Sequence, residues 1–468
     1  QAAIIVGLWL IAGSNPAENL GLVAFFAVCI GFSSATQDIV IDAWRIEAAP
    51  QERQGMMAAA YQWGYRIAQI IAGALALALA DHYGWAFSYT VMAALMVFGV
   101  AAVLLAPREQ AHVIREVPTD GVPRRRTLEI VEWTVRVAVL VLSAIVLGLG
   151  LTGNGAFLGF LTAPILGADA SASFVSAFTA KPDGIWLQLL FVASGFALLF
   201  AAVVPLPGTK TWPGAYLSHL LGDPLRDFFK RHSSTATLIL ALICVYRLAE
   251  SVLNIMNPFY LDLGFSLTEI AEVRKIFGTI ATLVGVSAGG IAIVRFGLMR
   301  SLVVGAFAQP LSHIGFIWLA TEGHHMPALF VAIGLDNIAS GFAGTCLIAY
   351  MSSLTSVGFT ASQYALFSSL YSLFGKIIAS QSGRIVESSA QSAEAGGAFG
   401  ALRNLFGALP ADAYVRASDL GVGPASLGTG YVVFFIYSGL IGIAGIILAV
   451  IIAAREKPEA EQPVQPAA

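Results

Sequence analysis

The sequence carries very little charge for its length. Only 11% of its 468 residues are Asp, Glu, Lys or Arg, whereas 57% are hydrophobic. A soluble domain carries roughly 25% charged residues, so this chain cannot cover a water-facing surface. Its net charge of −3 leaves no basic excess of the kind that binds nucleic acid. These shortages exclude an ordinary soluble enzyme, a disordered protein and a nucleic-acid-binding protein.

Cysteines and recognisable catalytic motifs are also scarce. The three cysteines, Cys29, Cys244 and Cys346, lie far apart in apolar runs, so they form no disulfide framework and no zinc spacing. The 148–153 stretch matches G-x-G-x-x-G, but no strand precedes it, which favours small-residue packing in a helix. The His324-His325 pair has no companion ligands. We expect no metal, no cofactor and, in the absence of a Walker A motif, no ATP-driven step.

Long hydrophobic runs dominate the sequence. About 20 apolar residues cross a bilayer as a helix, and lipid admits only helices or closed barrels. The runs show no strand alternation, so we expect an all-α integral membrane protein with eleven complete spans and one partial span. The predicted spans are 1–13 (partial), 19–46, 55–80, 85–106, 133–152, 185–206, 236–257, 268–293, 300–320, 326–354, 362–387 and 430–453. We interpret the partial span, which starts at Gln1, as the tail of a helix, with earlier helices missing.

The distribution of Lys and Arg predicts the orientation of the chain. Five arginines lie in 107–132 and four Lys or Arg residues lie in 207–235, whereas 153–184 holds only Lys181. Basic loops stay cytoplasmic. We therefore expect 107–132, 207–235 and the C-terminal tail in the cytoplasm, and 388–428 outside. The 213–231 stretch predicts a short helix from Asp223 that either lies on the membrane surface or links two bundles.

An offset of 310 residues aligns two parts of the chain. It places Gly31-Phe32 on Gly341-Phe342, Tyr61 on Tyr371, and Arg66 on Lys376. Such parallel half-repeats are typical of major-facilitator transporters. The 290–300 stretch resembles their cytoplasmic loop motif, with Val294 in place of the usual Asp. The expected architecture is therefore a major-facilitator-type bundle of two pseudo-symmetric halves, 1–106 and 236–454, joined by 107–235 with two extra helices and followed by a tail, 455–468.

Polar side chains inside the predicted spans are the candidate functional residues, because burying a charge in hydrocarbon is costly. Asp38 and Asp42 share one helix face and repel each other, which suits reversible protonation. Arg45 can neutralise Asp42, and Arg66 lies at a depth where it could pair with Asp38. A purely structural ion pair is the alternative interpretation.

A second polar stripe runs along the 236–257 span. Its residues follow i, i+3, i+7 and i+10 spacing, which predicts either a cavity lining or helix–helix contacts. The proton-coupling candidates are Asp38, Asp42 and Glu250. The substrate-cavity candidates are Thr36, Gln37, Gln62, Tyr65, Arg66, Arg247, Asn254, Asn257, Asp336, Gln363, Tyr364 and Lys376.

The run from Ser34 to Arg45, SATQDIVIDAWR, resembles the signature of AmpG-type muropeptide permeases. The Gly64–Arg66 and Gln363–Leu366 stretches are similar to that family as well. The resemblance implies a proton symporter of the bacterial inner membrane that needs no cofactor beyond the proton-motive force. It would import N-acetylglucosaminyl-1,6-anhydro-N-acetylmuramyl peptides from the periplasm for peptidoglycan recycling, a flux linked to β-lactamase induction.

Two alternatives remain open at this stage. An acetyl-CoA-transporter-like or siderophore carrier would share the architecture, but a substrate with several phosphates needs more cations inside the bundle. An integral-membrane lipid-modifying enzyme would need a nucleophile or metal cluster at the interface. We expect a carrier that contacts a small glycopeptide and membrane lipids, not nucleic acid, and that works without enzymatic chemistry.

Overall fold

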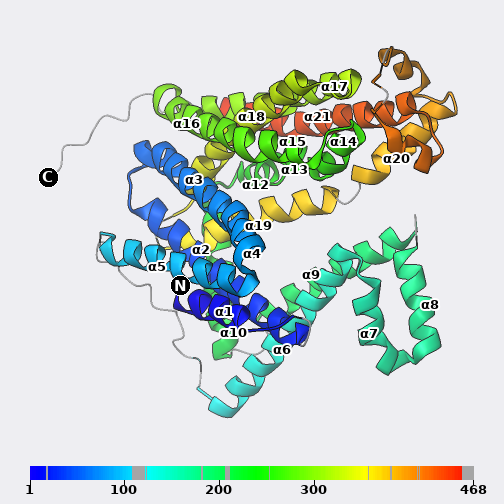
Figure 1. Ribbon diagram of the computed structural model, residues 1–468. Helices are drawn as coiled ribbons and strands as arrows, with labels where there is room; N and C mark the ends of the chain where they lie inside the picture. Colours follow the sequence, from blue (N-terminus) through cyan, green and yellow to red (C-terminus); the bar gives the residue numbers. More distant parts are fainter. Residues whose placement is uncertain are drawn as a thin grey trace. The chain divides into compact units, whose positions relative to one another are not determined.

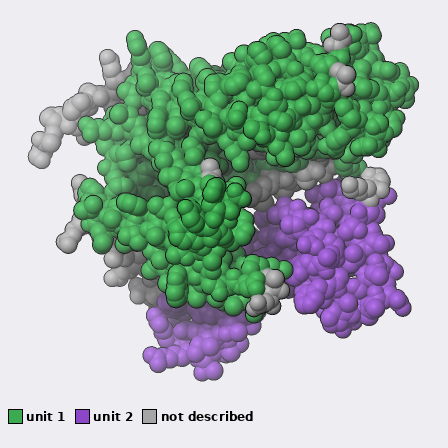
Figure 2. Space-filling view, in the orientation of Figure 1, with its two compact units in different colours: residues 1–112, 232–468 green, residues 113–231 purple. Residues whose placement is uncertain are grey.

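The computed structural model describes residues 1–16, 19–107, 122, 124–180, 183–205, 211–251, 253–356, 358–379, 382–407, 409–410 and 412–455. All regular elements within these residues are helices (Figure 1). Contacts between residues divide the chain into two units, Gln1–His112 with His232–Ala468, and Val113–Arg231 (Figure 2). The predicted division into two halves, a connecting region and a tail stays a prediction.

Ten helices in the described parts of the chain are long and apolar enough to cross a membrane. Each overlaps a predicted span, which confirms the all-α, multi-span fold. They are Leu20–Glu47, Gln54–Tyr83, Trp85–Leu105, Arg126–Thr152, Gly184–Val203, Ala236–Asp262, Leu267–Phe296, Leu298–Glu322, Met326–Ser353 and Pro424–Arg455. In place of the eleventh predicted span, 362–387, the structure has α19 (Thr360–Ala379) and α20 (Ser382–Glu394), and residues 380 and 381 lie outside the described residues.

The N-terminal part of the first unit consists of helices joined by short turns. Asn19 starts the first long helix by accepting a hydrogen bond from the Leu22 backbone at 3.1 Å. Gly84 separates α4 from α5 with φ +84°, a value that favours glycine. The elements are α1 (Ala2–Ala12), α2 (Leu20–Glu47), η1 (Gln51–Arg53), α3 (Gln54–Ile70), η2 (Ile71–Leu75), α4 (Ala76–Tyr83) and α5 (Trp85–Leu105).

The C-terminal part of this unit contains a broken helix. The sequence predicts one continuous helix over 236–257, but the structure interrupts it around Tyr246-Arg247 and again at η4. Because of these breaks, the predicted polar residues of 236–257 do not share one helix face. The elements are α12 (Ala236–Val245), α13 (Leu248–Ser251), η4 (Leu253–Ile255), α14 (Met256–Asp262), α15 (Leu267–Ala271), η5 (Glu272–Phe277), α16 (Gly278–Phe296), α17 (Leu298–Glu322), α18 (Met326–Ser353), α19, α20, η6 (Gly400–Leu405), η7 (Val415–Leu420) and α21 (Pro424–Arg455).

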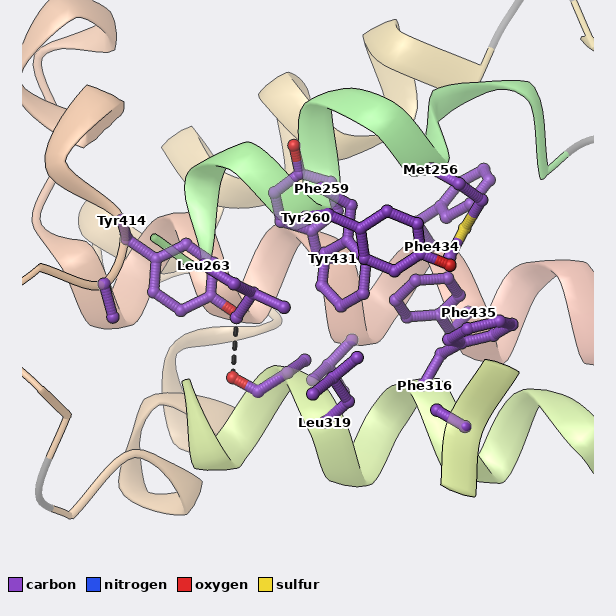
Figure 3. Close-up of a cluster of buried hydrophobic side chains, with 14 of the residues drawn as sticks. Met256, Phe259, Tyr260, Leu263, Phe316, Leu319, Tyr414, Tyr431, Phe434 and Phe435 are labelled. Atoms are coloured by element: carbon purple, nitrogen blue, oxygen red, sulfur yellow. Dashed lines mark hydrogen bonds between the residues drawn. The ribbon is translucent and has the colours of Figure 1, made fainter. Parts of the chain in front are cut away.

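The 388–428 connection folds back onto the core of this part of the chain. Tyr414 is fully buried and stacks near Tyr431, and its hydroxyl donates to the Ala320 carbonyl at 2.7 Å (Figure 3). The Asp262 carboxylate accepts from the Tyr431 hydroxyl at 2.6 Å and pairs with Arg416 at 3.2 Å. The connection is thus a packed cap over α14, α17 and α21.

The contacts between α2, α3, α18 and α19 fit the sequence repeat. The 310-residue offset maps α2 onto α18 and α3 onto α19. In the structure α3 contacts α18, and α2 contacts α19. When each helix is replaced by its counterpart in the repeat, the α3–α18 contact becomes the α2–α19 contact and the reverse. A twofold relation between the two parts requires this.

The second unit holds the two extra apolar helices, α6 (Arg126–Thr152) and α9 (Gly184–Val203). Two observations show that these helices pack closely. A Cβ at Gly150 would lie only 2.8 Å from the Gln188 carbonyl oxygen, and the Ser143 hydroxyl donates to the Gly195 carbonyl at 2.8 Å. This contact confirms the packing interpretation at Gly150, whereas Gly148 faces open space. The 153–184 connection contains two helices that the sequence analysis missed, α7 (Gly155–Leu166) and α8 (Ala168–Thr179).

The predicted amphipathic segment of this unit is helical throughout. It comprises α10 (Trp212–Leu217), η3 (Ser218–Gly222) and α11 (Asp223–Arg231), so the predicted start at Asp223 is a junction within a longer helix. Phe228 is buried, whereas Leu225 and Phe229 remain exposed. Its role, at the membrane surface or as a linker, stays a prediction.

Candidate functional site

Three clusters of charged side chains among the described residues of the first unit contain predicted site residues, and the first surrounds Arg45. This guanidinium is 3% exposed and lies 3.3 Å from the Asp42 carboxylate and 3.2 Å from the Ser352 hydroxyl. The rings of Tyr61 and Tyr364 lie 5.2 and 5.3 Å from it, within the range of a cation–π contact. The Arg45 cluster joins α2 and α3 to α18 and α19.

The Arg45 cluster confirms one predicted ion pair, and the structure contradicts another. Asp42 and Arg45 pair as expected from their i, i+3 spacing. Asp38 is exposed on α2, and among the described residues no ion pair joins it to Arg66. Arg66 instead donates to the side chain of Gln69, three residues along the same helix, at 3.1 Å.

The second cluster surrounds Arg247, at the break between α12 and α13. Arg247 pairs with Glu250 and donates to the hydroxyls of Ser340 at 3.0 Å and Tyr371 at 3.1 Å. Ser340 in turn donates to Glu250 at 2.7 Å, so the three side chains close a ring. The side chains of Arg247 and Glu250 are 11% and 28% exposed, which leaves the carboxylate within reach of a ligand.

Helix α3 contributes to this Arg247 cluster from the N-terminal part of the chain. A Cβ at Gly344 would lie 3.2 Å from both the Gln62 amide nitrogen and an Arg247 guanidinium nitrogen. The absence of a side chain at Gly344 therefore lets Gln62 and Arg247 approach each other. Arg66 interacts electrostatically with Arg247 and Glu250. The structure thus brings together four predicted site residues, Gln62, Arg66, Arg247 and Glu250.

The third cluster centres on His313 of α17 and Asp336 of α18, and sequence analysis identified only Asp336. The His313 Nε2 atom lies 4.0 Å from Asp336 Oδ1. That oxygen also accepts from Gln309 at 3.3 Å and Ser312 at 3.1 Å. His313 is 1% exposed, and its Nδ1 lies 2.8 Å from the Ser438 hydroxyl. The position of His313 inside the apolar 300–320 span is the sequence feature that could have identified it as a candidate site residue.

Other predicted cavity residues lie apart from these clusters. Asn254 donates to the Ala379 carbonyl at 3.0 Å, and Asn257 accepts from Arg274. Gln363 is buried and accepts from the Ser356 backbone at 2.8 Å. Thr36 donates to the carbonyl of its own helix and Tyr65 is exposed, whereas Gln37 is half-buried. The side chain of Lys376 lies outside the described residues.

His324, in the connection between α17 and α18, contacts the 388–428 connection and the first turn of the Leu267–Phe296 span. Its Nδ1 lies 2.8 Å from Asp412 and its Nε2 lies 3.3 Å from Glu269. The hydrogen bond with Asp412 raises the pKa of His324 above its usual range and lowers the pKa of Asp412. Since both ring nitrogens face carboxylates, a protonated His324 forms ion pairs with Asp412 and Glu269. The described residues hold no group of three possible metal ligands.

Comparison with known proteins points to one superfamily. Residues 2–221, just under half of the chain, match the sequence model of the Major Facilitator Superfamily. The chain is thus similar to the major facilitator superfamily over this stretch. This superfamily comprises transporters, so the chain is a multi-pass membrane transporter and not an enzyme, and the lipid-modifying enzyme is excluded.

Relatives with curated names support the AmpG resemblance as a distant relationship. The chain is 27% identical over 389 residues to putative transporter AmpG 4 of Rickettsia felis, covering 82% of this chain and 71% of that protein. It is 28% identical over 373 residues to the anhydromuropeptide permease of Escherichia coli K12, covering 79% of this chain and 56% of that protein.

Proposed function

We propose that this transporter imports anhydromuropeptides across the bacterial inner membrane, from periplasm to cytoplasm, for peptidoglycan recycling. The transport would be coupled to proton entry, with the C-terminus in the cytoplasm. The names of the distant relatives supply the substrate class. The signature run that carries the resemblance also lies in the described part of α2, where Asp42 and Arg45 form the first charged cluster.

The observation that carries the proposal is the meeting of α3 with the broken helix at Arg247. Substrate sites of this superfamily lie near the midplane between its repeated parts. Gln62 and Arg66 come from one part, and Arg247 and Glu250 come from the other. Because the two arginines exceed the single carboxylate by one charge, the site suits a substrate that carries a carboxylate.

The chemistry of an anhydromuropeptide fits these side chains. Its peptide ends in a carboxylate, which a guanidinium binds through paired hydrogen bonds. Its sugar hydroxyls and amides match the Gln62 amide and the hydroxyls of Tyr371 and Ser340. A coenzyme A ester carries several phosphate charges, which one surplus cation cannot balance, so the site favours the glycopeptide over that alternative.

The direct test is uptake by the purified chain in proteoliposomes. Radiolabelled N-acetylglucosaminyl-1,6-anhydro-N-acetylmuramyl tripeptide is supplied outside, with the external medium more acidic than the lumen. We expect accumulation that a protonophore abolishes and that excess unlabelled substrate competes away. Acetyl-CoA and a ferric siderophore serve as alternative substrates in the same vesicles. Accumulation of either one, without accumulation of the glycopeptide, would overturn the proposed substrate.

A further inference from the structure

We propose that His313 and Asp336 together form a proton-binding site that holds one proton and couples it to the Arg247 cluster. This inference rests on the proposed proton-coupled transport. It starts from the position of His313, which is 1% exposed inside the apolar helix α17 with Nε2 directed at Asp336. Sequence analysis assigned proton coupling to Asp38, Asp42 and Glu250, so this pair is a separate site.

The hydrogen bonds around Ser438 define the state of the histidine ring. The Ser438 hydroxyl has a single hydrogen, and its 2.9 Å bond to the Phe435 carbonyl uses it. We therefore assign His313 Nδ1, 2.8 Å away, as the donor to the same oxygen. A neutral ring with its hydrogen on Nδ1 presents a lone pair at Nε2. Among the residues that the structure describes, this atom has no hydrogen-bond partner, and Asp336 Oδ1 lies 4.0 Å from it.

Only neutral hydrogen-bond donors contact the Asp336 carboxylate among the described residues, so its negative charge is weakly stabilised. Its Oδ1 accepts from the neutral groups of Gln309 at 3.3 Å and Ser312 at 3.1 Å. The Ser312 hydroxyl also donates to the Gln309 carbonyl at 2.7 Å, so its one hydrogen serves two acceptors. An ionised carboxylate facing the lone pair of Nε2 sets two acceptors against each other. One proton resolves this repulsion, whether it resides on the carboxyl group or on the ring.

The surrounding titratable groups connect this pair to the proposed substrate site. Glu250 interacts electrostatically with both His313 and Asp336, and Arg247 and Tyr260 interact with Asp336. Asp336 and Ser340 are four residues apart on one face of α18, and Ser340 donates to Glu250. A proton on the pair cancels the negative charge of Asp336, so Arg247 then interacts with one charged carboxylate, Glu250, instead of two. Arg247 can then bind a substrate carboxylate, and release of the proton restores the second negative charge.

The first test uses no substrate. Histidine labelled with nitrogen-15 in the full chain, reconstituted in lipid, reports the tautomer of each ring by NMR. The sequence has seven histidines, and the His313→Gln variant assigns the signal. We expect a ring with hydrogen on Nδ1 at alkaline pH, whose titration shifts in Asp336→Asn but not in Asp419→Asn, an exposed control in η7. A ring with hydrogen on Nε2 only, or a titration unchanged in Asp336→Asn, would refute the site.

The second test separates proton coupling from substrate binding. In proteoliposomes, Asp336→Asn should lose accumulation driven by a pH gradient but keep exchange of labelled for unlabelled glycopeptide, whereas Asp419→Asn keeps both. Retained gradient-driven accumulation in Asp336→Asn overturns the coupling role. If the unaltered chain transports no glycopeptide, the proposed substrate fails, while the NMR titration still decides whether the pair binds a proton.

Discussion

The ion pair between Arg247 and Glu250 gives the most quantitative prediction. Glu250→Gln removes the negative charge but keeps an oxygen that can accept from Ser340. Breaking a buried pair from one side costs about 3–5 kcal/mol. Glu250 is 28% exposed, and water screens part of the interaction, so we expect a loss of about 1–3 kcal/mol in the free energy of unfolding.

A double-mutant cycle isolates this interaction. Glu250→Gln, Arg247→Met and the double variant are unfolded reversibly with SDS in mixed micelles, followed by tryptophan fluorescence. The coupling free energy should be about 1–3 kcal/mol, because each single change strands the other group. The exposed Asp223–Arg226 pair, with side chains 32% and 75% exposed, is the matched control, and its coupling should stay below about 0.5 kcal/mol. Equal coupling in the two cycles would refute the claim that the Arg247 cluster is a desolvated charged site.

Three further predictions test other parts of the account. Asp42→Asn leaves Arg45 buried without its carboxylate and should lower the free energy of unfolding by about 3 kcal/mol. Asp38→Asn, which breaks no ion pair with the described residues, should change that free energy by less than about 0.5 kcal/mol. Similar losses in both variants would contradict the assigned pairing. Gly285→Ala would place a methyl 2.1 Å from the Ile338 carbonyl oxygen and should cost about 1–3 kcal/mol in the same SDS assay, unlike Gly148→Ala, which has open space; equal stability of the two would argue against the α16–α18 contact. The pKa of His324 is raised, so its ion pair with Asp412 stabilises the fold fully below the ordinary histidine pKa of about 6.5 and loses that contribution as pH rises through the raised value; NMR titration should show a lower His324 pKa in Asp412→Asn, and an unchanged pKa would exclude the contact.

Much of the fold was predictable because hydrocarbon imposes a simple rule on the sequence. An apolar run of helical length identifies a membrane span without any knowledge of the helices that pack against it. All ten long helices of the described residues therefore overlap predicted spans. The i, i+3 spacing likewise predicted the Asp42–Arg45 pair, since partners within one helix need no knowledge of packing. The close approach of Gly150 followed from the excess of small residues at helix contacts.

The errors arose where tertiary contacts decide the structure. No proline or glycine in the sequence marks the break at Tyr246-Arg247. Beyond the break, Asn254 contacts α19 and Asn257 contacts η5. Arg66 was expected beside Asp38 from depth alone, but depth does not specify which face of a helix a side chain occupies. His313 escaped notice because its partners, Asp336 and Ser438, come from two other helices.

Substrate-dependent proton movement distinguishes proton-coupled import from uncoupled entry of the glycopeptide. Proteoliposomes containing the full chain and a lumenal pH indicator start with equal pH on both sides, and the anhydromuropeptide is added outside. We predict acidification of the lumen that begins with substrate entry and disappears in Asp336→Asn. Entry of the glycopeptide without any change in lumenal pH would contradict proton-coupled import.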